Sequence, residues 1–250
     1  MSVTSVEERE AEEAAAGGAA KRAYVQRIFS EIAPRYDLLN HVLSANVDRA
    51  WRRRAIAALQ WQRRPAGTYL DLCAGTMDVA AELAREPGFR GSVLAADFAE
   101  PMLRRGAAKT NGLRVRAAVA DVLQLPLADG AADGVIVAFG VRNFADLDAG
   151  LREMHRVTAP GGRLVILEFT TPPAALVRGA YELYSHHVLP FVGRMVSGHR
   201  TAYRYFPRSV DNFPDAPTLA ERLRDAGFID VNYRLLTFGI AAVHWGVRAA

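Results

Sequence analysis

The sequence predicts an α/β fold built on a mostly parallel, doubly wound sheet. Strand-like and helix-like segments alternate from residue 68 to residue 169, a pattern typical of parallel strands joined by crossover helices. Residues 134–139 form an almost unbroken apolar run, which suits a strand buried on both faces. At 250 residues, with 50% of them apolar, the chain is long enough to bury a large core without disulfides or metal.

Seven strands and four helices around them are expected. The strands are residues 68–73, 92–96, 113–119, 134–139, 163–169, 228–236 and 240–247. The helices are residues 79–85, 100–109, 147–157 and 218–226. The last two strands are joined through Phe238-Gly239, so we expect them to form a closing antiparallel hairpin.

Further segments precede and interrupt this sheet. Residues 1–20 are rich in Glu and Ala and are expected to be a disordered tail or a frayed helix, which leaves residues 21–250 as one domain. Three helices are expected before the sheet, at residues 24–32, 38–44 and 48–59. Pro34 ends the first of them and Asp48 is expected to cap the third. An aromatic-rich insertion, residues 174–212, is expected to form a helical cap over the substrate.

The composition excludes several classes of protein. Cys73 is the only cysteine, which rules out an internal disulfide and suits a reducing compartment; we expect it to be a small buried side chain. No Cys and His residues have the spacing of a zinc site, so no metal is expected. The N-terminus has no secretory signal and no apolar stretch could span a bilayer, which favours a cytoplasmic protein.

Positive charge is concentrated around one predicted helix. The net charge is +4, and all the cationic residues but two are arginines. The cluster comprises Arg49, Arg52, Arg53, Arg54, Arg63 and Arg64. It is either a solvated helix face or a contact for an anionic membrane surface, in which case the protein would be peripheral at the inner face of the membrane. No groove-reading motif accompanies the cluster, so nucleic acid is not an expected partner.

The turn after the first strand predicts a nucleoside site. Residues 69–78 turn at Gly75, and the second strand leads to Asp97. In a doubly wound sheet these two positions lie side by side, where a carboxylate binds ribose hydroxyls, although Asp97 could instead cap the helix near Glu100. Gly75 is the only glycine in the turn, which disfavours a pyrophosphate. The expected ligand is therefore a nucleoside without phosphates, and S-adenosylmethionine is the commonest such cofactor.

Several motifs occur in this chain in the order known from one family. They lie in residues 25–37, 70–78, 139–143, 153–157 and 160–169. Tyr36-Asp37 and Phe139-Gly-Val-Arg-Asn143 are the most specific of them. Together they resemble the quinone-biosynthesis C-methyltransferases, which act on demethylmenaquinone or on 2-polyprenyl-6-methoxy-1,4-benzoquinol. The resemblance covers nearly everything after about residue 22. It implies a Rossmann-like class I methyltransferase that uses S-adenosylmethionine to methylate a ring carbon of a polyprenylated hydroquinol.

Three departures from the family pattern bear on the site. Met77 stands where Gly or Ala is common, and a bulky side chain there would lie against the cofactor or narrow its pocket. Ala138 replaces a Ser that often precedes Phe139, which removes one hydrogen bond. Cys73 is similar to the cysteine in the turn of menaquinone-pathway members, which favours that substrate.

The resemblance also assigns the cofactor site. Gly75 and Thr76 are expected to contact the methionine or ribose portion, and Tyr36 is expected to close over the cofactor. Asp121 and Val122 would flank the adenine, with Asp121 accepting a hydrogen bond from the exocyclic amine. As alternatives, Asp121 is only a turn residue and Tyr36 only joins two helices.

Methylation of a ring carbon requires an electron-rich ring, so the expected substrate is the reduced hydroquinol. Phenols ionise near pH 10, and a base or a cationic neighbour lowers the cost of that ionisation. Arg142 with Asn143 is the catalytic candidate, unless Arg142 only pairs with Glu168 or Asp37. The wall around the ring and its tail is expected to include Tyr184, His187 and Tyr203.

Several functions remain open at this point. Demethylmenaquinol, which would give menaquinol, is the favoured substrate, and the benzoquinol of ubiquinone synthesis is the nearest alternative. A non-catalytic member that holds cofactor or lipid in a biosynthetic complex is a second class, which Met77 and Ala138 favour. The single-glycine turn disfavours a nicotinamide oxidoreductase. A lipid substrate implies transient contact with a membrane surface, and the sequence leaves open whether the chain forms a homodimer.

Overall fold

The computed structural model describes residues 18–33, 46–184, 205 and 208–250 of the chain. Most of the N-terminal tail and the expected helix at residues 38–44 lie outside these ranges. Three predicted site residues, Tyr36, His187 and Tyr203, lie outside them too.

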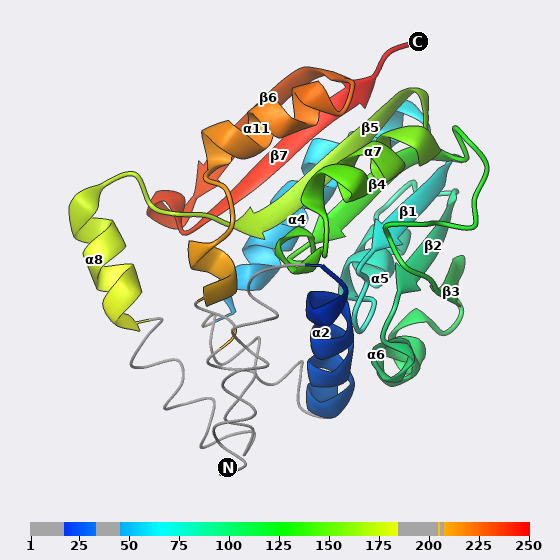
Figure 1. The fold of residues 1–250 in the computed structure, drawn as a ribbon. Helices are drawn as coiled ribbons and strands as arrows, with labels where there is room; N and C mark the ends of the chain where they lie inside the picture. The colour runs from blue at the N-terminus through cyan, green and yellow to red at the C-terminus, as the bar shows by residue number, and fades with distance from the viewer. Residues whose placement is uncertain (1–17, 34–45, 185–204, 206–207) are drawn as a thin grey trace.

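A seven-stranded sheet with the order β3-β2-β1-β4-β5-β7-β6 forms the centre of the fold (Figure 1). Its strands are β1 (Thr68–Leu72), β2 (Ser92–Asp97), β3 (Val115–Val119), β4 (Ala132–Ala138), β5 (Thr158–Phe169), β6 (Phe228–Leu236) and β7 (Ala241–Arg248). The first five pair in parallel, and β7 pairs antiparallel with both β5 and β6. The predicted fold class is confirmed, including the closing hairpin.

β5 begins earlier than the sequence predicts. Ala132 pairs with Thr158, but the next paired residues are Gly134 and Arg163, so the segment between Thr158 and Arg163 bulges out of the ladder. Gly161, at φ 69°, allows the chain to make this excursion without a Cβ clash. The Pro160-Gly161-Gly162 segment therefore forms a bulge near the start of β5, and the strand begins before this segment.

Helices cover both faces of the sheet (Figure 1). The first face carries α4 (Val47–Leu59), α5 (Asp78–Ala84) and α6 (Glu100–Gly106), and the second carries α7 (Leu147–Val157) and α11 (Ala216–Asp225). Beside the carboxyl ends of the strands lies α2 (Gly18–Ile32), which contacts α6. A further helix, α8 (Ala175–Leu183), follows β5.

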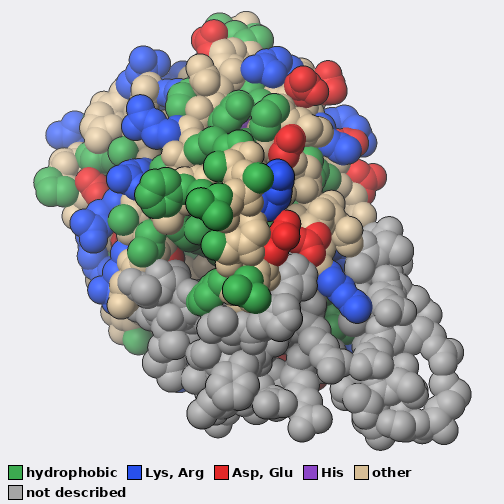
Figure 2. Space-filling model, turned by 90° about the vertical axis from the view of Figure 1, so that its left-hand side faces the viewer, with side chains coloured by type: hydrophobic (Ala, Val, Ile, Leu, Met, Phe, Trp, Pro, Cys, Tyr) green, Lys and Arg blue, Asp and Glu red, His purple; other side chains and the backbone are tan. Residues whose placement is uncertain are grey.

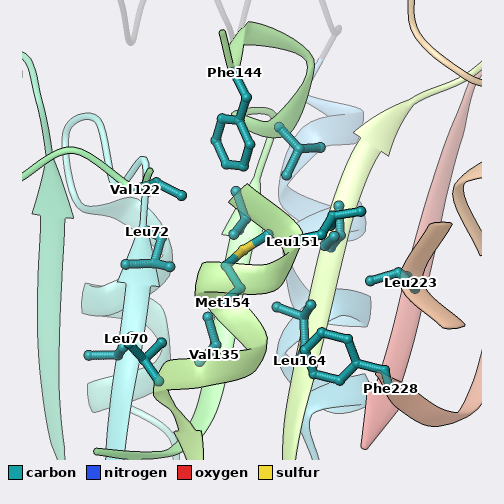
Figure 3. Packing of buried hydrophobic residues seen from close by; sticks show 14 of the residues in the cluster. Leu70, Leu72, Val122, Val135, Phe144, Leu151, Met154, Leu164, Leu223 and Phe228 are labelled. Atoms are coloured by element: carbon teal, nitrogen blue, oxygen red, sulfur yellow. The ribbon is translucent and has the colours of Figure 1, made fainter. Parts of the chain in front are cut away.

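The core under α7 is a continuous apolar layer (Figure 3). Leu151 and Met154 of α7 pack over Val135 of β4 and Leu164 of β5, and all four side chains are fully buried. Asp146 starts α7 by accepting a hydrogen bond from the backbone of the first turn. Burial of this apolar surface stabilises the sheet and fixes the strand ends that carry the site.

Two N-terminal helix boundaries differ from the prediction. α2 begins at Gly18 instead of Tyr24. Asn46, in the left-handed conformation, precedes α4, and Asp48 lies inside its first turn, so the prediction that Asp48 caps this helix was wrong. Its carboxylate instead pairs with Arg52 at 2.8 Å, one helical turn on, and both side chains are buried. One arginine of the predicted cationic cluster is therefore internal.

Candidate functional site

A pocket opens where the carboxyl ends of β1, β2 and β4 meet. It holds about 660 Å³ of empty space including its open mouth, a size that suits a small-molecule ligand. Five of the predicted site residues line it, namely Gly75, Asp97, Asp121, Val122 and Asn143. The strand order explains this position, because the crossovers on either side of β1 run in opposite directions and leave a crevice.

Asp97 ends β2 and is held by two backbone amides. Its Oδ2 accepts a hydrogen bond from Gly75 N and its Oδ1 accepts one from Ala99 N, both at 2.8 Å. Burial raises the pKa of this carboxyl, and the amide hydrogen bonds oppose that shift. Ala99 is the residue that precedes α6, so Asp97 is not the helix cap. Each carboxylate oxygen has a second lone pair that can accept a ligand hydroxyl.

Left-handed residues build the turn between β1 and α5. Cys73, Gly75 and Met77 have φ angles of 53°, 53° and 60°. This conformation is unstrained only for glycine, so the two residues with side chains are held there by their surroundings. One such restraint is the Asp71 carboxyl group, whose Oδ2 accepts a hydrogen bond from Ala80 N at 2.9 Å and ties β1 to the first turn of α5.

Neither Met77 nor Thr76 lines the pocket. Met77 is 2% exposed and packs in the apolar core under α4 and α5, so the expectation that it narrows the cofactor pocket was wrong. Thr76 is equally buried, and its Oγ1 accepts a hydrogen bond from Lys109 Nζ at 2.9 Å. Thr76 is not among the residues that line the pocket, and its contact with a cofactor stays a prediction.

Gly106→Ala is expected to weaken ligand binding by displacing this turn. A Cβ at residue 106 would lie 2.2 Å from the Thr76 carbonyl oxygen, and a backbone atom cannot rotate aside. We expect the dissociation constant for adenosylhomocysteine to rise about tenfold and the unfolding free energy to fall by about 1–3 kcal/mol, measured by calorimetry and urea unfolding. Gly179→Ala is the control, because nothing lies within 4 Å of its Cβ position. Equal binding by the two variants would contradict the expectation.

The Asp71 carboxyl should make stability depend on pH. Burial raises its pKa to about 8, whereas in the unfolded chain a carboxyl of this type titrates near 3.9. The folded state therefore holds the extra proton between about pH 4 and pH 8, and its stability falls as the pH rises through that window. The Asn side chain of Asp71→Asn does not titrate. Between about pH 4 and pH 8, the unfolding free energy of the variant should therefore rise relative to that of the wild type by up to about 1.4 kcal/mol for each pH unit. Urea unfolding at several pH values measures the gain, and parallel curves would exclude it.

Asp121 follows β3 and connects the pocket to α2. Its Oδ1 accepts a hydrogen bond from Leu123 N at 2.9 Å, and its Oδ2 pairs with Arg22 Nε at 2.8 Å. Arg22 also lines the pocket, beside the buried Val122. Arg22 was not among the predicted site residues, and no motif in the sequence singles it out.

Arg142 lies just outside the pocket, in the short 3-10 helix after β4. Its Nη1 pairs with Glu168 Oε1 at 2.7 Å and donates a hydrogen bond to the Phe139 carbonyl at 2.6 Å. Its guanidinium also lies over the Phe169 ring. Arg142 therefore forms the ion pair with Glu168 that was the expected alternative to a catalytic role. The pair positions the guanidinium, which has more N–H donors than one carboxylate oxygen can accept.

A second cavity lies beside the first and shares part of its wall. It holds about 680 Å³ of empty space including its mouth, and its lining includes Lys21, Arg142 and Tyr205. The Tyr205 hydroxyl donates a hydrogen bond to Asn143 Oδ1 at 3.2 Å. Because Asn143 lines the first pocket, this contact links the two spaces.

Of the two lysines of this arginine-rich chain, one lines a cavity and the other supports the turn between β1 and α5. Lys109 donates hydrogen bonds to Thr76 and Asp78 in the turn, and Lys21 lines the second cavity. Neither was predicted as a site residue. Their rarity was the available signal, because lysine and arginine are not interchangeable where proton release or a compact charge is needed.

Tyr184 is the predicted substrate residue that the structure describes. It is half-buried, burial raises its pKa, and it is not among the residues that line either cavity. Within the described ranges, no group of three or more His, Cys, Asp and Glu side chains could hold a metal ion. The helices of this part of the chain include none that is long and apolar enough to cross a bilayer.

The sheet order and the crevice beside β1 define a Rossmann-like fold with its ligand site at the carboxyl ends of the strands. Solved structures share the fold. A SAM-dependent methyltransferase of Thermotoga maritima, described as a possible histamine N-methyltransferase, aligns with a TM-score of 0.64 at 16% identity, over 89% of this chain and 98% of that one. A phosphoethanolamine N-methyltransferase of Haemonchus contortus, solved with S-adenosyl-L-methionine, aligns with a TM-score of 0.56 at 14% identity, over 78% of this chain and 52% of that one.

The chain belongs to the ubiE/COQ5 methyltransferase family, whose model matches residues 18–248. Demethylmenaquinone methyltransferases of Thermus thermophilus and Deinococcus radiodurans are 51% and 48% identical to it, over 88% and 89% of this chain and 100% and 91% of theirs. The ubiquinone/menaquinone biosynthesis C-methyltransferase UbiE of Geobacter sulfurreducens is 41% identical, over 90% of this chain and 88% of its own. The family, the enzyme class and the cofactor predicted from the motifs are confirmed.

Proposed function

We propose that this protein transfers a methyl group from S-adenosylmethionine to a ring carbon of a polyprenylated hydroquinol, with demethylmenaquinol as substrate and menaquinol as product. The observation that carries the proposal is the wall shared by two cavities, one lined by carboxylates and the other by cations. The names of the two relatives from Thermus and Deinococcus support the naphthoquinol ring.

The first pocket fits the cofactor. Asp97 presents a buried carboxylate that suits the two ribose hydroxyls, and Gly75 brings the backbone close without a side chain. Asp121 would accept a hydrogen bond from the adenine amine once its ion pair with Arg22 opens. The bound cofactor supplies an electrophilic methyl group on a cationic sulfur, and the Phe139 ring on the pocket wall favours a cation.

Arg142 would act on the substrate. A guanidinium beside the ring hydroxyl stabilises the phenolate, which raises the electron density on the neighbouring ring carbon. Asn143, held by Tyr205, would orient the same hydroxyl from the wall of the first pocket. The proposed wall for the ring and its prenyl tail is Tyr184, His187 and Tyr203.

Methyl incorporation from labelled cofactor tests the proposal. The purified protein is supplied with demethylmenaquinol or with the demethylated benzoquinol under anaerobic conditions. We expect labelled menaquinol to form faster than the benzoquinol product. Faster methylation of the benzoquinol would assign the ubiquinone alternative. No product from either ring, with adenosylhomocysteine still bound in calorimetry, would favour the non-catalytic member.

A lipid substrate also implies contact with a membrane surface, and one face of the molecule suits that contact. Leu176 and Leu183 of α8 are 88% and 63% exposed, and Phe238 is 81% exposed. Figure 2 shows hydrophobic side chains near the centre of the face and many Lys and Arg side chains along its left-hand side. Trp51 Nε1 donates a hydrogen bond to Thr237 Oγ1 at 2.9 Å, which holds α4 beside the Phe238 turn.

Flotation with vesicles of anionic phospholipid tests this contact. Replacing Arg53 and Arg54, both exposed on α4, with Gln is expected to weaken vesicle binding by about 2 kcal/mol. The matched control replaces Arg104 and Arg105, both exposed on α6, with Gln. An equal bound fraction for the two double variants would remove the arginine face from the proposal.

A further inference from the structure

The second cavity gathers cations, and no Asp or Glu is among its described lining residues. Its charged side chains are Lys21, Arg142 and Arg222. Arg142 pairs with Glu168, and Arg222 pairs with Asp148 at 2.9 Å, but neither acid lines the cavity. Within the part of the chain that the structure describes, no hydrogen bond or ion pair joins the Lys21 ammonium to another residue.

Lys21 is the cation here that can release a proton. The guanidinium groups of Arg142 and Arg222 stay protonated at all ordinary pH values, so they stabilise an anion but cannot accept a proton. Burial and the charge of Arg142 lower the pKa of Lys21. Among the described residues that line the cavity, the other group that can release a proton is Tyr205, and burial raises its pKa, so it remains a proton donor.

The position of Lys21 relative to the cofactor pocket also matters. Lys21 is adjacent in the sequence to Arg22, which lines that pocket, whereas Lys21 lines the second cavity. Phe144 lines both spaces and forms part of the wall between them. A ring bound in the second cavity against Phe144 would have its hydroxyl beside Lys21 and Arg142 and its reacting carbon toward the cofactor pocket.

We propose that Lys21, as a neutral amine, accepts the proton of the ring hydroxyl, while Arg142 stabilises the phenolate that forms. This assignment rests on the proposed function and adds to it the identity of the proton acceptor. Lys21 is then a catalytic base that touches the substrate oxygen.

The substrate O–H bond breaks, the proton moves to Lys21 Nζ, and the electron pair spreads from oxygen to the neighbouring ring carbon. That carbon forms a bond to the methyl group, while the methyl–sulfur bond breaks and its electron pair stays on sulfur. The ring proton at the same carbon is lost to water. The Lys21 ammonium then returns its proton to the oxygen, which restores the hydroquinol and the amine.

Two substitutions of Lys21 separate proton transfer from charge. Lys21→Met removes both, and Lys21→Arg keeps the charge but cannot accept a proton. We expect kcat with demethylmenaquinol to fall by about 10²–10⁴-fold in both variants, with the dissociation constant for adenosylhomocysteine unchanged. In the wild type, kcat should rise with pH and level off as Lys21 loses its proton. In both variants the plateau should disappear, because only hydroxide or a residual base then takes the proton.

The matched control is Arg27→Met, which removes an exposed cation from the same helix and lies outside both cavities. It should keep the wild-type rate and pH profile. A Lys21→Arg variant at the wild-type rate would overturn the assignment, because charge alone would then suffice. A plateau that persists in Lys21→Met but disappears in His187→Gln would overturn it in favour of His187.

Failure of the proposed function gives a different result. In that case the wild type itself makes no methylated product from either quinol, and the assignment of Lys21 falls with it. If the wild type is active and the Lys21 variants bind adenosylhomocysteine but match Arg27→Met in rate, the function stands and the assignment alone is wrong.

Discussion

Replacing Arg142 with Met is expected to lower both the stability of the protein and its rate of methyl transfer. The Glu168 carboxylate is 1% exposed, and the substitution leaves it without its charge partner at 2.7 Å. Breaking one side of a buried ion pair costs about 3–5 kcal/mol, which urea unfolding would detect. The loss of a donor that stabilises a developing anion should lower kcat by about 10²–10³-fold.

A double variant separates these two losses. Arg142→Met combined with Glu168→Met replaces the ion pair with apolar side chains of similar length, an exchange that is often neutral for stability. We expect the double variant to recover most of the unfolding free energy and none of the activity. Recovery of activity along with stability would show that Arg142 only supports the fold, which is the structural alternative.

Asp97→Asn is expected to weaken cofactor binding and also to lower the stability of the fold, because the new NH2 group cannot accept the hydrogen bond that one of the two backbone amides donates. The carboxylate accepts hydrogen bonds from Gly75 N and Ala99 N and lines the pocket, so an amide in its place loses charge at the proposed ribose contact. Hydrogen bonds to a charged group contribute about 1.5–3 kcal/mol, so the dissociation constant for adenosylhomocysteine should rise by about 10–100-fold. Titration calorimetry measures the change.

Asp133→Asn is the matched control for this effect. The Asp133 carboxylate likewise accepts a backbone hydrogen bond, from Thr68 N at 2.8 Å, and it also pairs with Arg64. Thr68 begins β1, at the end of the strand opposite the pocket, so this substitution should leave cofactor binding unchanged. Equal binding losses in the two variants would mean that Asp97 acts through the fold and not through ribose.

The fold was predictable because its signals are local. Unbroken apolar runs and helix-length segments between them gave seven strands and their order of appearance, and the parallel sheet follows from short crossovers. The helix starts were less predictable. Asp48 has the residue type of a cap, but its pairing with Arg52 competes with capping, and the residue pattern alone does not rank the two.

The site was predictable where it follows from the sheet. Gly75 and Asp97 lie together because the ends of β1 and β2 are neighbours, a rule that needs no knowledge of side-chain contacts. Arg22 and Lys21 could not be placed in this way. They come from α2, whose position against the sheet depends on packing between segments far apart in the sequence, as the Arg22–Asp121 ion pair shows.

Met77 has a consequence for engineering by consensus. Its left-handed backbone is strained by about 1–2 kcal/mol relative to glycine. Truncating a fully buried methionine, however, typically loses about 2–5 kcal/mol, so methionine is the better residue in this chain. The frequency of a residue at a position is an average over many related sequences. The cavity that a smaller residue would leave at position 77 depends instead on the side chains that pack around it in this chain. A library that restores commoner residues at every unusual position would therefore destabilise the enzyme at position 77, however sound the statistics behind it.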